Sequence, residues 1–168
     1  LDFKGRISYL QFDPSISRLE KIKDDTIKSN LLKPELWDHS IEEANKLLDK
    51  SAEPTIIFGS ALNLLLFSPT YKNGILKKVE EILVKDKTKS YLFSVSNNVL
   101  SEDIVIWENA ADNLMFTRME KSKRLFLRVS RMKNVQFLGE EMEVPISKEM
   151  FREIKLIADK PEKGRFLL

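Results

Sequence analysis

The sequence predicts an α/β fold of three layers, a mostly parallel sheet between helices, with an antiparallel β-hairpin extension at its C-terminal end. One observation is the short apolar segment 56–58, which follows Pro54 and ends at Gly59-Ser60, as buried strands of parallel sheets do. Another is the alternation of strand-like and helix-like segments on either side of it. The third is period-two alternation in the last third of the chain, which indicates antiparallel strands.

The composition is that of one domain with a buried core. The chain has 168 residues, of which 42% are hydrophobic. Its 28 Lys and Arg nearly balance its 26 Asp and Glu, so the net charge of +2 does not indicate a nucleic-acid surface. The absence of cysteine excludes disulfides and is compatible with a cytoplasmic location. We see no membrane-spanning run and no signal peptide, and the 32% of charged residues favours a thermophile.

The N-terminal third is expected to form a strand and two helices. A strand is expected over 5–12, and Asp13 gives a capping signal for a helix over 16–32, where apolar residues recur at near-helical spacing. A second helix is expected over 35–50, before the strand 56–58. We expect that strand to be buried on both faces.

The middle of the chain is expected to continue the alternation. A short buried helix is expected from Ser60 to Phe67, followed by a helix that ends near Val84. A strand is expected over 90–96, and residues 101–103 would cap the next helix.

The C-terminal third is expected to be antiparallel. Strands are expected over 113–118 and 124–132, joined by the polar turn 120–123. A last strand over 142–146 and a final helix over 147–159 complete the pattern.

One domain is expected over 1–160, with an apolar tail over 161–168. The tail ends in Phe166-Leu167-Leu168. It has two interpretations, a segment that docks on a neighbouring subunit and an end that folds onto its own core.

Three segments resemble the RecA superfamily, and most closely its KaiC-like and archaeal recombinase-paralogue branch. Residues 9–15 resemble the strand that delivers the family's catalytic carboxylates, and 56–60 resemble the strand that normally ends in Asp-Ser. Residues 111–116 and 125–134 resemble the family's Ala-Asp-Gly strand and its basic hairpin. The likeness spans about residues 5–146 and implies a RecA-like P-loop NTPase fold with ATP-binding relatives.

The family's chemistry is only partly represented. Its phosphate loop, G-x-x-x-x-G-K-[ST], does not occur in this sequence and would have to precede Leu1. Gly59 stands where the family has an Asp that organises Mg²⁺. ATP or ADP with Mg²⁺ is therefore expected only if a phosphate loop lies upstream. The resemblance leaves Asp13 as the candidate catalytic acid, and Pro14 replaces the second acid.

The resemblance also indicates four cofactor-binding candidates. Ser60 follows the central strand and Asn97 would be a polar sensor at a strand end. Arg131 and Lys133 lie two residues apart, which puts both charges on one face of a strand. In the family the matching basic pair reaches a neighbour's nucleotide phosphates; the alternative is a solvated hairpin. No side chains have metal-ligand spacing, so no metal site is expected.

The aromatic and histidine residues are expected to be structural. Trp37 and Trp107 lie on the inner faces of predicted helices and are expected in the core. His39, the only histidine, has no Ser or Cys partner in a catalytic pattern and is expected on the surface.

The leading hypothesis is a catalytically degenerate RecA/KaiC-like domain with a regulatory or assembly role, in a homo-oligomer or beside a RecA-like paralogue. The second is a nucleotide-binding ATPase whose phosphate loop lies upstream. The third is a DNA-binding recombinase paralogue, favoured by a local cluster of Arg124, Arg128, Arg131 and Lys133 and opposed by the near-neutral net charge. Nucleic acid is therefore not indicated, and no membrane partner is expected.

Overall fold

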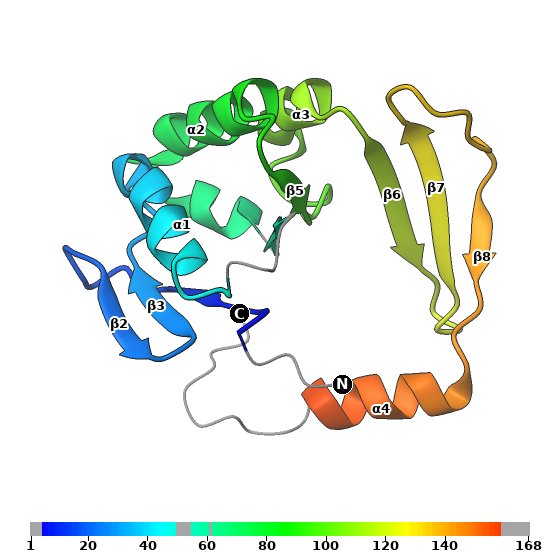
Figure 1. Cartoon of the computed structure of the whole chain (residues 1–168). Helices are drawn as coiled ribbons and strands as arrows, with labels where there is room; N and C mark the ends of the chain where they lie inside the picture. The colour runs from blue at the N-terminus through cyan, green and yellow to red at the C-terminus, as the bar shows by residue number, and fades with distance from the viewer. Residues whose placement is uncertain (1–4, 50–54, 61, 159–168) are drawn as a thin grey trace. The chain divides into compact units, whose positions relative to one another are not determined.

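The protein divides into two compact units, residues 1–111 and residues 112–168. The computed structural model describes residues 5–49, 55–60 and 62–158, and Figure 1 labels its elements. The fold is mixed α/β with three small sheets, two of which contain a parallel pair of strands. The expected α/β class is confirmed, but the described strands do not join into one continuous sheet. The predicted tail over 161–168 lies outside the described residues.

The first sheet comprises β1 (Tyr9–Phe12), β2 (Glu20–Lys23) and β3 (Thr26–Ser29), in the order β1-β3-β2. β3 pairs in parallel with β1 and antiparallel with β2. The expected helix over 16–32 is therefore wrong. Asp24 and Asp25 form the turn of a β2–β3 hairpin and interrupt the apolar spacing that indicated a helix. Acidic turn residues compete with helix formation because they favour turn conformations of their own backbone.

The helices of the first unit enclose one hydrophobic core. Two of them follow the first sheet, η1 (Pro34–Leu36) and α1 (Trp37–Asn45). The others are η2 (Leu62–Phe67), α2 (Lys72–Lys85) and α3 (Ser101–Ala110). Helices α1, η2, α2 and α3 turn apolar residues to the inside. The core consists of Trp37, Leu62, Leu65, Leu66, Ile75, Val79, Ile82, Ile104 and Trp107.

Both tryptophans are buried, as expected, and each indole has a hydrogen-bond partner. Trp37 Nε1 donates to the backbone oxygen of Leu31 at 2.9 Å. Trp107 Nε1 donates to the backbone oxygen of Leu76 at 3.0 Å. A buried indole N–H without a partner would oppose folding, so these bonds help to fix where α1 and α3 lie. His39 is exposed on α1, as expected.

The central parallel pair consists of β4 (Ile56–Gly59) and β5 (Ser90–Phe93), with α2 in the connection between them. This is the connection that parallel neighbours require. The expectation that β4 is buried on both faces is wrong, because Ile56 and Phe58 are 68% and 64% exposed. Ile57 is half-buried, and on β5 it is Tyr91 and Phe93 that pack against the core.

Helix α3 begins without the expected cap. Residues 101–103 do not cap it by a side chain; the N-cap residue is Leu100, whose φ of 55° is left-handed. Such a conformation is uncommon for a branched apolar residue. It lets the chain turn sharply from the loop after β5 into the helix.

The second unit is a three-stranded antiparallel sheet followed by a helix. β6 (Leu114–Met119), β7 (Leu125–Arg131) and β8 (Met142–Val144) lie in that order. Helix α4 (Lys148–Ala158) is capped by Ser147, whose hydroxyl accepts a hydrogen bond from the backbone N–H of Met150 at 3.0 Å. The expected hairpin, last strand and final helix are confirmed.

A buried pair of hydroxyls joins β3 to α1 and supports a prediction. Ser40 Oγ donates to the backbone oxygen of Leu36 at 2.6 Å, so the proton in its 2.7 Å contact with Ser29 Oγ comes from Ser29. Ser40→Ala leaves the buried Ser29 donor unsatisfied and should cost about 1–3 kcal/mol of unfolding free energy. Ser29→Ala leaves Ser40 bonded to Leu36 and should cost about 1 kcal/mol. Urea unfolding of both variants measures this order, and a larger loss for Ser29→Ala would contradict it.

Candidate functional site

The carboxyl ends of β4 and β5 form the candidate site, because ligands of parallel α/β sheets bind beyond these ends. Gly59 is the last residue of β4, and its backbone oxygen accepts a hydrogen bond from Ser94 N at 2.8 Å. Ser60 follows Gly59 and is exposed. Asn97 is exposed in the turn that follows β5. Two of the four predicted binding residues therefore follow neighbouring strands at the same edge.

Gly59 is in close contact with the ring of Phe93. A Cβ atom on Gly59 would lie 2.9 Å from Phe93 Cδ1 and 3.3 Å from Leu62 Cδ2. The first separation is shorter than real carbon contacts, so any side chain here would have to displace the ring. This edge therefore presents an aromatic ring against the backbone of position 59.

Asn63 holds the loop after β5 in place, although sequence reasoning did not single it out. Its side chain is buried, and its Nδ2 donates to Ser96 O at 3.3 Å while its Oδ1 accepts from Ser96 N at 3.3 Å. The signal that was available is that Asn63 is the one polar residue in the apolar run 61–67. Its amide ties η2 to the segment that carries Asn97.

Asp13 lies directly after β1, and its carboxylate is already hydrogen-bonded on both oxygens. Oδ1 accepts from Ser15 N at 3.0 Å and Ser15 Oγ at 2.6 Å, and Oδ2 accepts from Lys28 Nζ at 3.2 Å. The hydroxyl of Ser15, then its backbone N–H and Lys28, hold the pKa of Asp13 below its ordinary value. Such a carboxylate stays ionised and is a poor proton acceptor. Its geometry is that of a side chain that fixes the turn after β1.

Arg131 and Lys133 lie at the end of β7 that is distant from the β6–β7 turn. Arg131 is the last residue of β7, so the expectation that the two cations share a face of one strand is not met. Lys133 Nζ forms an ion pair with Asp112 Oδ1 at 2.9 Å, and Lys133 N donates to Asn113 Oδ1 at 3.0 Å. Lys133 is thus held within its own unit.

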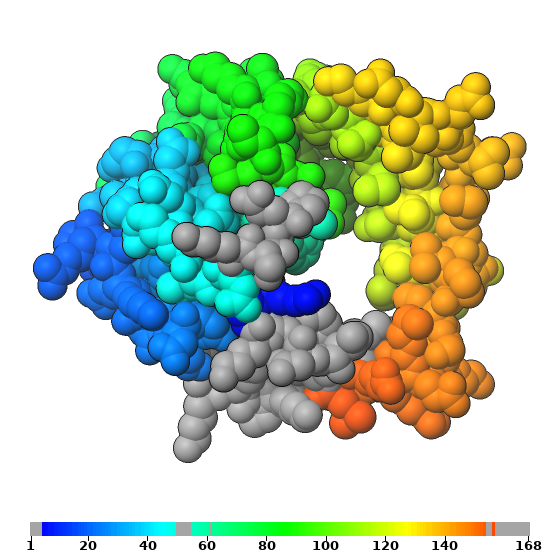
Figure 2. Space-filling view, viewed as in Figure 1, coloured from blue at the N-terminus to red at the C-terminus, as the bar shows by residue number. Residues whose placement is uncertain are grey.

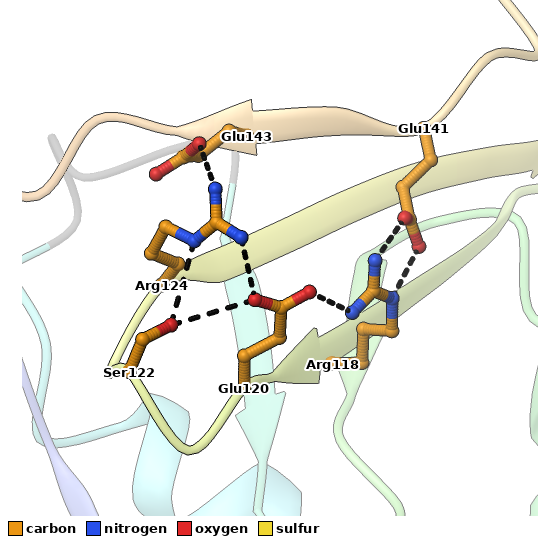
Figure 3. Close-up of polar contacts among 6 residues, drawn as sticks. All are labelled: Arg118, Glu120, Ser122, Arg124, Glu141 and Glu143. Carbon is orange, nitrogen blue, oxygen red and sulfur yellow. Dashed lines mark hydrogen bonds and ion pairs between the residues drawn. The ribbon is translucent and has the colours of Figure 1, made fainter.

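A network of arginine and glutamate side chains covers one face of the second unit's sheet, as Figure 3 shows. Arg118 contacts Glu141 through two nitrogens, at 2.8 and 2.5 Å, and Glu120 through the third, at 3.0 Å. Arg124 contacts Glu120 at 2.8 Å and Glu143 at 3.5 Å. The bidentate pair is the strongest geometry that such side chains form.

The same face carries two phenylalanine rings beneath guanidinium groups. The Arg118 guanidinium lies 4.1 Å from the centre of the Phe126 ring, and that of Arg128 lies 5.2 Å from the Phe116 ring. These cation–π contacts hold the arginines flat on the sheet. Carboxylates pair with Arg124 here and with Lys133 at the other end of β7, which weakens the case for a basic cluster that binds DNA.

The comparisons with known proteins give no relative: no protein-family model, curated protein or solved structure matches the chain. Within residues 5–49, 55–60 and 62–158, no group of three His, Cys, Asp or Glu side chains has the arrangement of a metal site. In the same residues no helix combines the length and the apolar character that a membrane crossing requires.

The contact between Gly59 and Phe93 predicts a non-additive pair of substitutions. Gly59→Ala should lower the unfolding free energy by about 1–3 kcal/mol, because its methyl group meets the ring. Combined with Phe93→Leu, which removes ring atoms, the alanine should cost clearly less than it does alone. Urea unfolding of the two single variants and the double variant gives the coupling energy. Additive losses would mean that the ring does not restrict position 59.

The arginine network predicts a dependence on pH. Arg118 bonds hold the pKa of Glu120 and Glu141 below their ordinary value of 4.5. Each carboxyl has a lower pKa in the folded protein than in the unfolded chain. The ion pairs therefore stabilise the fold fully at pH values above the unfolded-state pKa, and this stabilisation is lost as the pH falls through the folded-state pKa. Glu141→Gln should therefore lower the melting temperature near neutral pH, and this difference from the unsubstituted protein should shrink in acid.

The adjacent Glu140 offers a matched control, because it forms no ion pair with a described residue. Glu140→Gln should leave the melting temperature nearly unchanged at every pH. An equal effect of the two substitutions would show that general charge, and not the Arg118 pair, accounts for the pH dependence.

Proposed function

We propose that this chain is a catalytically degenerate RecA/KaiC-like domain that serves a regulatory or assembly role. The observation that carries this proposal is the Phe93 ring in the space that a side chain at position 59 would need. An edge without a carboxylate cannot organise Mg²⁺ and its water in the way that phosphoryl transfer requires.

The order of elements supports the RecA-like part of the proposal. The parallel strands β4 and β5, each followed by a helix, precede an antiparallel extension, as the resemblance implies. The three-layer arrangement is part of the proposal, and the exposed face of β4 is the side on which a further layer would lie. Likeness of fold alone does not establish a function, so the argument rests on the site.

The contacts of the other candidate residues favour a non-catalytic role. The Asp13 carboxylate is engaged by Ser15 and Lys28, which leaves little capacity for a proton or a metal. Lys133 is paired with Asp112 within its own unit. Neither arrangement is that of a group poised to act on a nucleotide, although both suit a stable surface for a partner subunit or homo-oligomer.

Calorimetry of ATP and ADP binding, with Mg²⁺ present, tests the proposal on the full-length protein. The expected result is no detectable heat at millimolar nucleotide, since no described group replaces the phosphate loop or the missing carboxylate. Micromolar binding would support the alternative, a nucleotide-binding ATPase whose phosphate loop lies upstream.

A paired substitution sharpens that test. Gly59→Asp alone should be destabilising, because its Cβ meets Phe93, whereas Gly59→Asp with Phe93→Ala gives the carboxylate room. The double variant should fold and still show no ATP hydrolysis. Hydrolysis by the double variant would contradict a purely regulatory role and would show that the edge lacks only its acid.

A further inference from the structure

The edge strand β8 is held on β7 by few contacts. It has three residues, and its register on β7 consists of three pairs, Leu125–Val144, Phe126–Glu143 and Leu127–Met142. In β8, Met142 and Glu143 are exposed and Val144 is half-buried, so burial adds little on the β8 side. A short edge strand of this kind opens at a lower free-energy cost than the strands it borders.

Ion pairs determine which strand can pair with the free edge of β7. Glu141 and Glu143 are two residues apart, so an extended backbone turns both carboxylates to the same face. On that face Arg118 of β6 binds Glu141, and Arg124, which directly precedes β7, binds Glu143. The β7 edge therefore fits an extended segment with carboxylates at alternate positions, and the Glu141–Val144 segment is one that fits.

The connection from β7 to β8 carries apolar side chains that are exposed and not buried in its own unit. Residues 132–141 form the gold loop between these strands in Figure 1, and they lie on the visible surface in Figure 2. Val135, Phe137 and Leu138 are 57%, 40% and 69% exposed. Exposed apolar side chains so close together on one short segment are typical of an interaction site.

We propose that β8 exchanges between two copies of this chain, so that Glu141 and Glu143 of one copy bind Arg118 and Arg124 of the other. This inference rests on the proposed assembly function and names its contact. Each β7–β8 pairing within one chain is remade between two chains, so the exchange sacrifices none of these pairings. The segment 134–140 acts as the hinge.

A second copy is the occupant that the structure favours, for two reasons. Its β8 has the sequence that the β7 edge accepts, with both carboxylates in register. An exchanged dimer also brings two hinges side by side across the two-fold axis, where Val135, Phe137 and Leu138 are buried against their counterparts. A different partner whose strand carries carboxylates at alternate positions would provide the first of these gains and not the second.

The absence of cysteine allows a direct test with introduced thiols. One preparation carries Leu127→Cys and a second carries Met142→Cys, since these positions are partners in the register. The two are mixed, incubated at low and at high ionic strength, and oxidised. The expected result is a disulfide-linked species of twice 19.5 kDa that contains one chain of each kind. High salt should accelerate its formation, because it screens the ion pairs that hold β8.

A matched control and a second pair keep the test decisive. Met119→Cys mixed with Met142→Cys should give no such dimer, because β6 and β8 are separated by β7. Leu125→Cys mixed with Val144→Cys repeats the experiment at another register pair, in case a substitution at Leu127 impairs folding. The double variant Leu127→Cys/Met142→Cys should form this disulfide whether β8 is exchanged or not, within one chain or between two, and so confirms the register.

The remaining outcomes separate this inference from the proposed function. A dimer in solution that yields no mixed disulfide would overturn the exchange and leave an assembly role through another surface. A chain that stays monomeric, with thiols that link only within the double variant, would also overturn it. Nucleotide binding in the calorimetric test would overturn the proposed function whatever the thiols show.

Discussion

Where β4 and β5 end, the ring of Phe93 lies against the backbone of Gly59, and much of the first unit depends on this approach. The missing side chain at position 59 lets the ring reach the core, where it joins residues of η2, α2 and α3. The same approach brings the Ser94 N–H to the Gly59 carbonyl, which extends the pairing of the two strands by one hydrogen bond. Asn63 then attaches the following loop to η2. Packing at this edge thus occupies the space that a side chain at position 59 would need.

The two units differ in where they place their polar and charged side chains. The first buries a small number of them, each with a partner, such as Ser29, Ser40 and Asn63. The second carries a network of exposed charges on one face of its sheet, where arginines lie on phenylalanine rings and pair with glutamates. Exposed pairs of this kind contribute little individually and acquire specificity as a network. The charges in the second unit therefore select which strand pairs with which, more than they add stability.

Much of this architecture could be predicted from the sequence, where a local pattern determined the element. Helices α2 and α3 have apolar stripes with helical spacing, and the β6–β7 hairpin has period-two alternation around a polar turn. The segment 16–32 was predicted wrongly because its few apolar residues fit two periods, and the Asp24-Asp25 turn decided between them. The exposure of Ile56 and Phe58 could not be predicted, because burial on a second face depends on which elements lie nearby and not on the strand itself.

The candidate site could be predicted only where a local pattern determined the position of a residue. Ser60 and Asn97 follow β4 and β5, and parallel pairing places both strand ends at one edge. The partners of Asp13 and Lys133 were not predictable, since Lys28 and Asp112 come from strands and turns whose positions only the fold determines. Arg131 ends β7 instead of continuing it, and no local signal marks that boundary.

The separation along the chain of paired strands has a kinetic consequence. In the second unit β6 and β7 are joined by a short turn, so their contacts form with little loss of loop entropy. In the first unit Ile56 of β4 pairs with Ser90 of β5 only after the whole of η2 and α2 has been brought between them. Contacts between distant residues slow the crossing of the folding barrier. The β6–β7 hairpin is therefore expected to form soon after its own residues are synthesised. The pairing of β4 with β5, which brings Gly59 against Phe93, is expected to form late, as the slow step in the folding of the first unit.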